Sequence, residues 1–124
     1  MHHSPGFLKL VEAERRHVKE ITVAAAKQRL AANPKCVLMD VREDSEWLKG
    51  HAVEATHLGK GVLERDLEQM IPEPGTEILM YCGGGYRSVL TASAARKLGY
   101  PNCFSIIGGY KAMVEATWPM STKP

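Results

Sequence analysis

Residues 77–100, EILMYCGGGYRSVLTASAARKLGY, contain a strand pattern, a glycine run and a helix pattern in direct succession. The run 77–81 is apolar without alternation, which is typical of a strand buried on both faces of a sheet. Three glycines follow Cys82. The alanine-rich stretch after them ends in basic residues and a glycine, and it predicts a helix over residues 88–98. Strand, loop and helix in this order are the repeating unit of an α/β domain.

The same alternation of apolar runs and helical patterns continues on both sides of this unit. Further strands are predicted at residues 19–22, 35–42, 55–58 and 103–107, and helices at 7–17, 23–32, 43–51, 61–71 and 110–116. This order predicts one α/β domain with a mostly parallel sheet. In such sheets, active sites lie beyond the carboxyl ends of the strands.

Helix ends are marked by capping residues and prolines. We expect Thr22 to cap the helix 23–32. The short helix 43–51 is expected to be capped by Asp44 or Ser45. Pro119 is expected to end the ordered chain.

Composition limits the classes of function. The net charge is +2 and only 6% of residues are aromatic, so nucleic-acid binding is not expected. No stretch is apolar enough to span a membrane, and no signal-peptide pattern is present. Three cysteines, Cys36, Cys82 and Cys103, favour free thiols in a cytoplasmic protein. Metal-ligand spacing is absent, so a metal site is not expected.

The glycine loop has two interpretations. It can be a tight turn beside a buried, inert cysteine. Alternatively, loop amides and a helix N-terminus surround the sulfur of Cys82 and favour its thiolate form. Arg87 supports the second interpretation, because a cation at a helix N-terminus opposes the helix dipole, and such conflicts are typical of functional sites. We expect Arg87 to hold an anionic substrate or to brace the loop, and Gly84 to need dihedral angles that side chains disfavour.

Three segments together resemble those of a single-domain rhodanese, a sulfurtransferase. They are LMDVREDSEWLKGHAVEATHL (38–58), ILMYCGGGYRS (78–88) and IIGGYKAMVEA (106–116). The resemblance implies a three-layer domain with a central five-stranded, mostly parallel sheet flanked by helices. It gives an N-terminal helical extension at 1–18, the rhodanese-like domain at 19–119 and a C-terminal tail at 120–124.

The resemblance also implies a reaction. The thiolate of Cys82 takes the outer sulfur of a donor such as thiosulfate or a persulfide. The resulting Cys82 persulfide passes this sulfur to cyanide, a small thiol or a protein cysteine. A sulfur-delivering protein is a further expected partner, and no cofactor is required.

Carried over by position, Cys82 is the catalytic residue. The loop that binds the substrate consists of Gly83, Gly84, Gly85, Tyr86, Arg87 and Ser88. Asp40 and Arg42 are supporting residues, although Arg42 can equally be structural and paired with Glu43 or Glu46. His51 is expected to be structural, and Trp47 to be core or pocket wall. Cys36 and Cys103 are expected to be structural, at the opposite end of the sheet.

Two rival functions remain open at this stage. Cysteine-dependent phosphatases and arsenate reductases have five residues between cysteine and arginine, whereas four separate Cys82 from Arg87. A persulfide carrier or binding module would keep the cysteine but turn over small donors slowly. The loop has three glycines where family members often have charged or bulky residues. We therefore expect a roomier, less positive cradle that suits a bulkier donor better than thiosulfate.

Overall fold

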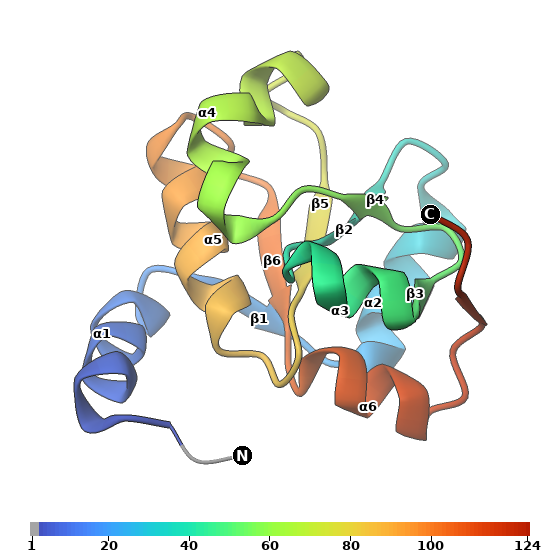
Figure 1. Ribbon diagram of the computed structural model, residues 1–124. Coiled ribbons are helices and arrows are strands. Elements are labelled where there is room, and N and C mark those ends of the chain that lie inside the picture. Colours follow the sequence, from blue (N-terminus) through green and yellow to red (C-terminus); the bar gives the residue numbers. More distant parts are fainter. Residues whose placement is uncertain (1–2) are drawn as a thin grey trace.

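The computed structural model describes residues 3–124 and is built around a parallel sheet (Figure 1). The sheet has five strands in the order β1-β6-β5-β2-β4, and every neighbouring pair is parallel. Its strands are β1 (Lys19–Ile21), β2 (Val37–Asp40), β4 (Thr56–His57), β5 (Ile78–Tyr81) and β6 (Cys103–Ile106). The predicted α/β class with a mostly parallel five-stranded sheet is confirmed.

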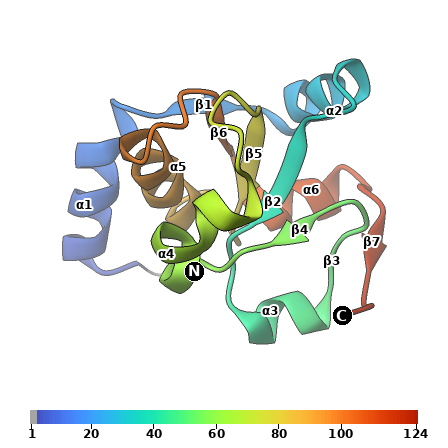
Figure 2. The ribbon, with the colours of Figure 1, turned by 90° about the horizontal axis from the view of Figure 1, so that it is seen from above.

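Helices cover both faces of the sheet. They are α1 (Pro5–Arg15), α2 (Val23–Ala32), α3 (Asp44–Lys49), α4 (Lys60–Met70), α5 (Arg87–Lys97) and α6 (Gly109–Glu115). Seen from above, α1, α4 and α5 lie on one side of the sheet, and α2 and α6 lie on the other (Figure 2). None of the helices in residues 3–124 is long and apolar enough to cross a membrane.

The two faces of β5 explain its unbroken apolar sequence. Ile78 and Met80 belong to the core beneath α4 and α5. Leu79 and Tyr81 belong to the core shared with α2 and α6. Because successive strand residues point to opposite faces, a strand covered on both sides must be apolar at every position.

The helix starts follow local capping chemistry, with one correction. Thr22 caps α2 as predicted, since its hydroxyl accepts the N–H of Ala25 at 3.1 Å. The cap of α3 is Glu43, not Asp44 or Ser45 as expected. Glu43 forms a reciprocal capping box with Glu46, which satisfies two backbone N–H groups at once.

A small second sheet was not predicted. The strands β3 (His51–Ala52) and β7 (Met120–Ser121) pair antiparallel. The expectation that the ordered chain ends at Pro119 is therefore wrong. Two-residue strands are too short to produce a hydrophobic period, so only their pairing across the fold defines them.

Candidate active site

Cys82 lies at the carboxyl end of β5, near the middle of the sheet (Figure 1). The chain turns through the glycine loop and enters α5 at Arg87. On the neighbouring strand β2, Asp40 is in register with Tyr81, one residue before the cysteine. The loops after β2 and β5 therefore meet at one edge of the sheet, where parallel α/β folds place their sites.

The sulfur of Cys82 is surrounded by donors. Sγ accepts the N–H of Gly85 at 3.1 Å and that of Ser88 at 3.3 Å. The hydroxyl of Ser88 lies 3.4 Å from the same sulfur. The amide of Ser88 belongs to the first turn of α5, where N–H groups have no partner within the helix. Hydrogen-bond donors of this kind favour the charged form of a thiol, and here they converge on a cysteine that is only 1% exposed.

A second hydroxyl supports the first. Ser105 on β6 lies 2.7 Å from the hydroxyl of Ser88, and both serines are fully buried. A thiolate only accepts hydrogen bonds, so an ionised Cys82 accepts one from the Ser88 hydroxyl, and the Ser88 oxygen accepts one from the Ser105 hydroxyl. Sequence reasoning missed Ser105. The available signal was a lone hydroxyl inside the apolar strand CFSII, because a buried polar side chain needs a partner.

The strained glycine of the loop is Gly85, not Gly84 as expected. Gly85 has φ +93°, and a Cβ there would lie 2.9 Å from the backbone nitrogen of Gly108. A Cβ on Gly84 would touch only the ring of Tyr86, at 3.8 Å. Gly109 allows the close approach of α6 to the loop, since a Cβ there would collide with the carbonyl of Cys82. The backbone therefore requires glycine at the two positions where the loop turns and where α6 meets it.

Arg87 braces the loop. Its guanidinium makes two hydrogen bonds to the carboxylate of Glu46, at 2.7 and 2.9 Å. These bonds lower the pKa of Glu46 to about 2, so the pair is charged on both sides at neutral pH. Of the two roles expected for Arg87, bracing is the one the geometry favours. Such a two-pronged pair fixes orientation as well as distance, and it ties α5 to α3.

Asp40 and Arg42 form a buried pair beside the site. The Nη2 of Arg42 lies 2.7 Å from the carboxylate of Asp40 and donates to the carbonyl of Gly50 at 2.6 Å. The expected pairing of Arg42 with Glu43 or Glu46 is wrong, since Glu46 is taken by Arg87. Both charges are almost fully buried, and each is neutralised by the other. Arg42 therefore fixes the end of α3 to the sheet.

His51 and Trp47 form a stack away from the sulfur. Their ring centroids lie 3.4 Å apart, and Nδ1 of His51 is 3.0 Å from the carbonyl oxygen of Trp47. The other face of Trp47 stacks on His57 at 4.7 Å. These contacts give both residues a packing role.

A cavity of about 880 Å³ opens above Cys82. Its lining residues are His3, Phe7, Glu43, Ser45, Glu46, Cys82, Gly83, Gly84, Tyr86, Arg87, Gly108, Lys111, Ala112 and Glu115. Cys82 and four of the six predicted loop residues, Gly83, Gly84, Tyr86 and Arg87, line this cavity. The other predicted site residues, Gly85, Ser88, Asp40 and Arg42, lie outside the lining. Sequence reasoning missed the contributions of α1 and α6. In the part of the chain from residue 3 onward, no group of three or more potential ligands could hold a metal ion.

Fold and site together define a class of α/β domain. A cysteine follows the central parallel strand, and its sulfur accepts hydrogen bonds from backbone amides of the loop and of the next helix. The family model described as "Rhodanese-like domain" matches residues 22–116. The chain belongs to this family, and the predicted family membership is confirmed.

Similar proteins agree with this membership. A Bacillus subtilis (strain 168) protein named "Putative sulfurtransferase YtwF" is 30% identical over 107 residues, covering 86% of this chain and 96% of that protein. The polysulfide-sulfur transferase homodimer of Wolinella succinogenes has a similar fold, with a TM-score of 0.80 at 24% identity over 94% of this chain and 87% of its own. A Rhodopseudomonas palustris structure described as a possible tyrosine phosphatase also has a TM-score of 0.80, at 22% identity and 98% coverage of both chains. The family and its sulfurtransferase-named relative support a transferase, and the two structures show the fold.

Proposed function

We propose that the protein is a sulfurtransferase in which Cys82 carries the transferred sulfur as a persulfide. The observation that carries this proposal is the set of donors directed at one sulfur, namely the amides of Gly85 and Ser88 and the Ser88 hydroxyl. Family membership and the sulfurtransferase-named relative support the same class of reaction.

The first half-reaction loads the cysteine. The thiolate of Cys82 attacks the outer sulfur of the donor, an S–S bond forms, and the S–S bond of the donor breaks. With thiosulfate, sulfite leaves with the electron pair of the broken bond. The charge then resides on the terminal sulfur of Cys82–S–S⁻, within reach of the loop donors.

The second half-reaction empties it. A nucleophilic acceptor attacks the terminal sulfur, and Cys82 leaves as a thiolate. The amides of Gly85 and Ser88 lower the energy of this leaving group because they already point at the sulfur. Two half-reactions through one covalent intermediate give ping-pong kinetics.

The acceptor in this proposal is cyanide, a small thiol or a protein cysteine, and a sulfur-delivering protein is a further partner. A reducing compartment such as the cytoplasm is the natural setting, since Cys36, Cys82 and Cys103 are all free thiols. The site uses its own backbone donors and needs no metal or other cofactor for either step.

A phosphatase or arsenate reductase activity is not favoured by the site. These enzymes need an arginine free to bind a tetrahedral oxyanion, whereas Arg87 is held by both oxygens of Glu46. The Glu46 carboxylate also lines the cavity and would repel a phosphate. The Rhodopseudomonas palustris structure is similar in fold and carries no argument for its activity here.

Intact-protein mass spectrometry after mixing with thiosulfate tests the proposal. We expect the mass to rise by one sulfur atom, and cyanide to remove that atom. Cys82→Ser should show no added sulfur and should lower transfer at least about a thousandfold, because the nucleophile is lost. Cys36→Ser, at a half-buried cysteine outside the cavity lining, is the matched control. Wild-type sulfur uptake by Cys82→Ser would contradict the assignment.

A further inference from the structure

One wall of the cavity comes from outside the segment that matches the family. The family model begins at residue 22, whereas α1 spans Pro5–Arg15. Phe7 of this helix and His3 just before it line the same cavity as Cys82. In Figure 1, the start of α1 lies on the same side of the molecule as the loop between β5 and α5. The N-terminal helix is therefore part of the site and not only an extension.

Packing and charge hold α1 firmly against α5. Val11 is fully buried on the helix face that also carries Phe7, four residues earlier. The carboxylate of Glu14 accepts hydrogen bonds from Ser93 and Lys97, both on α5. A wall fixed in this way keeps its shape before a ligand arrives, which lowers the cost of binding.

The wall is aromatic. The ring of His3 lies 4.4 Å from that of Tyr86 and 5.4 Å from that of Phe7, measured between centroids. All three rings are only partly buried, so part of each remains open to the cavity. Aromatic surfaces of this kind bind apolar and planar groups through burial and stacking.

The charges of the cavity do not suit a small dianion. Three carboxylates, Glu43, Glu46 and Glu115, line it, against two cations, Arg87 and Lys111. Arg87 is neutralised by Glu46. Among residues 3–124, Lys111 is thus the only lining cation outside that ion pair, and it shares the cavity with Glu43 and Glu115. A doubly negative inorganic donor gains little attraction here.

Resting on the sulfurtransferase function proposed above, we propose that Phe7, His3 and Tyr86 form a subsite for the organic body of the sulfur donor. The donor class is an organic persulfide or thiosulfonate with an aromatic or branched apolar group. With a persulfide, the thiolate of Cys82 attacks the terminal sulfur of R–S–SH, forming Cys82–S–S⁻. The broken S–S bond leaves its electron pair on R–S⁻, which takes the proton and departs as R–SH.

Two donors that differ only in their body test the subsite. Benzenethiosulfonate and methanethiosulfonate have the same charge and the same reactive sulfur, and each releases a sulfinate. The quantity to measure is the ratio of kcat/KM for the benzene donor to that for the methane donor, with cyanide as acceptor. Comparing this ratio between protein variants cancels the intrinsic difference in reactivity between the two donors.

Phe7→Ala should lower the ratio about five- to tenfold, because the benzene ring loses an aromatic contact. Leu10→Ala is the matched control, since Leu10 is on the same helix, is exposed and does not line the cavity. The control should leave the ratio unchanged. Phe7→Leu, which keeps a large apolar side chain at this position, should give an intermediate ratio even if Phe7→Ala is poorly folded.

The outcomes separate the two proposals. A ratio that is the same in wild type, Phe7→Ala and Phe7→Leu overturns the subsite, while sulfur added to Cys82 by either donor keeps the sulfurtransferase function. A ratio that falls equally in Leu10→Ala also overturns it, because the effect would then be general to α1. No added sulfur from either donor or from thiosulfate overturns both proposals.

Discussion

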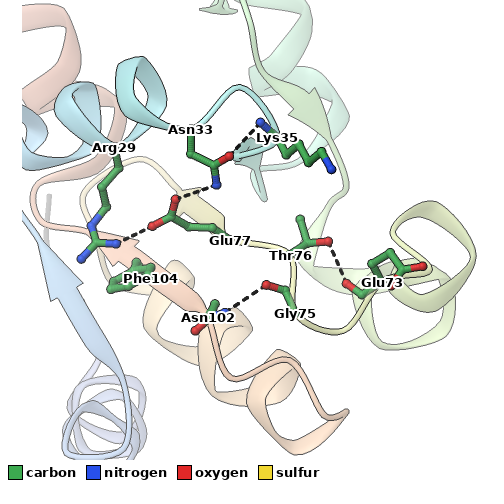
Figure 3. Close-up of a pocket in the computed structure, with 9 residues that line it drawn as sticks. All are labelled: Arg29, Asn33, Lys35, Glu73, Gly75, Thr76, Glu77, Asn102 and Phe104. Carbon is green, nitrogen blue, oxygen red and sulfur yellow. Dashed lines mark hydrogen bonds and ion pairs between the residues drawn. The ribbon is translucent and has the colours of Figure 1, made fainter.

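The two ends of the central sheet contain similar features, but they surround their cysteines with different chemical groups. Each end has a cavity and an arginine–glutamate pair: Arg87 with Glu46 at the carboxyl end, and Arg29 with Glu77 at the amino end. The amino-end cavity, of about 570 Å³, is shown in Figure 3, where Arg29 and Asn33 both reach Glu77. Phe104 lies beneath the guanidinium of Arg29.

The cysteines at the amino end are held as thiols. Burial raises the pKa of Cys103 to about 12. Burial and the nearby Glu77 carboxylate raise the pKa of Cys36 to about 12 as well. Cys82 is at least as buried, yet its sulfur receives the amides of Gly85 and Ser88. Burial by itself therefore does not decide the chemistry of a cysteine in this fold.

Strand direction explains the difference. At the carboxyl ends of parallel strands, the chain leaves toward a helix N-terminus, where free N–H groups point back at the sheet. At the amino ends, β2 and β6 each follow the C-terminus of a helix, whose free carbonyl groups repel a thiolate. A cysteine that follows β5 can be stabilised as an anion, whereas one that begins β6 cannot.

Alkylation should show the largest difference between the two ends. With limiting iodoacetamide at neutral pH, we expect Cys82 to be modified first. A pKa near 12 in place of the usual 9 leaves Cys36 and Cys103 about a thousandfold less thiolate below pH 9. Peptide mass mapping over time measures the three rates. Comparable alkylation rates at Cys82 and Cys103 would contradict the expected difference between the two ends of the sheet.

A methyl group added at Gly85 should disturb the loop that surrounds Cys82 at the carboxyl end of the sheet. Gly85→Ala places a Cβ against the backbone of Gly108 at positive φ, so we expect sulfur transfer to fall about tenfold or more and the fold to lose about 1–3 kcal/mol. Gly75→Ala at the amino end is the control, because a Cβ there meets nothing within 4 Å. Transfer assays and thermal unfolding of both variants measure the difference. Equal effects would show that the conformation of Gly85 has no special role.

Removing the second hydroxyl should give the smallest effect. In Ser105→Ala, Ser88 loses the donor that orients it toward Cys82. We expect alkylation of Cys82 at neutral pH to slow about three- to tenfold, since one hydrogen bond to the sulfur is weakened. Thr76→Ala is the control, since the Thr76 hydroxyl donates to the carbonyl of Glu73 and lines the cavity at the amino end. An alkylation rate of Cys82 that is the same in Ser105→Ala and in the wild type would show that Ser105 has a packing role only.

Most of the site core could be predicted because it is local in sequence. Cys82 and Ser88 are six residues apart, and one strand–loop–helix unit contains both partners of the sulfur. The glycine run, the apolar strand before it and the helix after it are each visible as short-range patterns. One of the three segments that carry the family resemblance, 78–88, lies in this unit. Local backbone geometry therefore fixes the position of Cys82.

The remaining features depend on residues far apart in the chain. Glu46 and Arg87 are 41 positions apart, and either could have been given another partner. Ser105 reaches Ser88 only because β6 lies beside β5. The identity of the strained glycine also depends on Gly108, which approaches from the start of α6.

The sequence by itself determined the α/β class, the order of the helices and of the central-sheet strands, and the cysteine that follows the central strand, because periodicity, capping and glycine placement act over a few residues. Only the tertiary structure decided which charges pair, which hydroxyl supports the sulfur and which helix closes the cavity. Those contacts form when sheet and helix packing bring distant segments together, and Phe7 reaches the cavity of Cys82 only because α1 packs on α5.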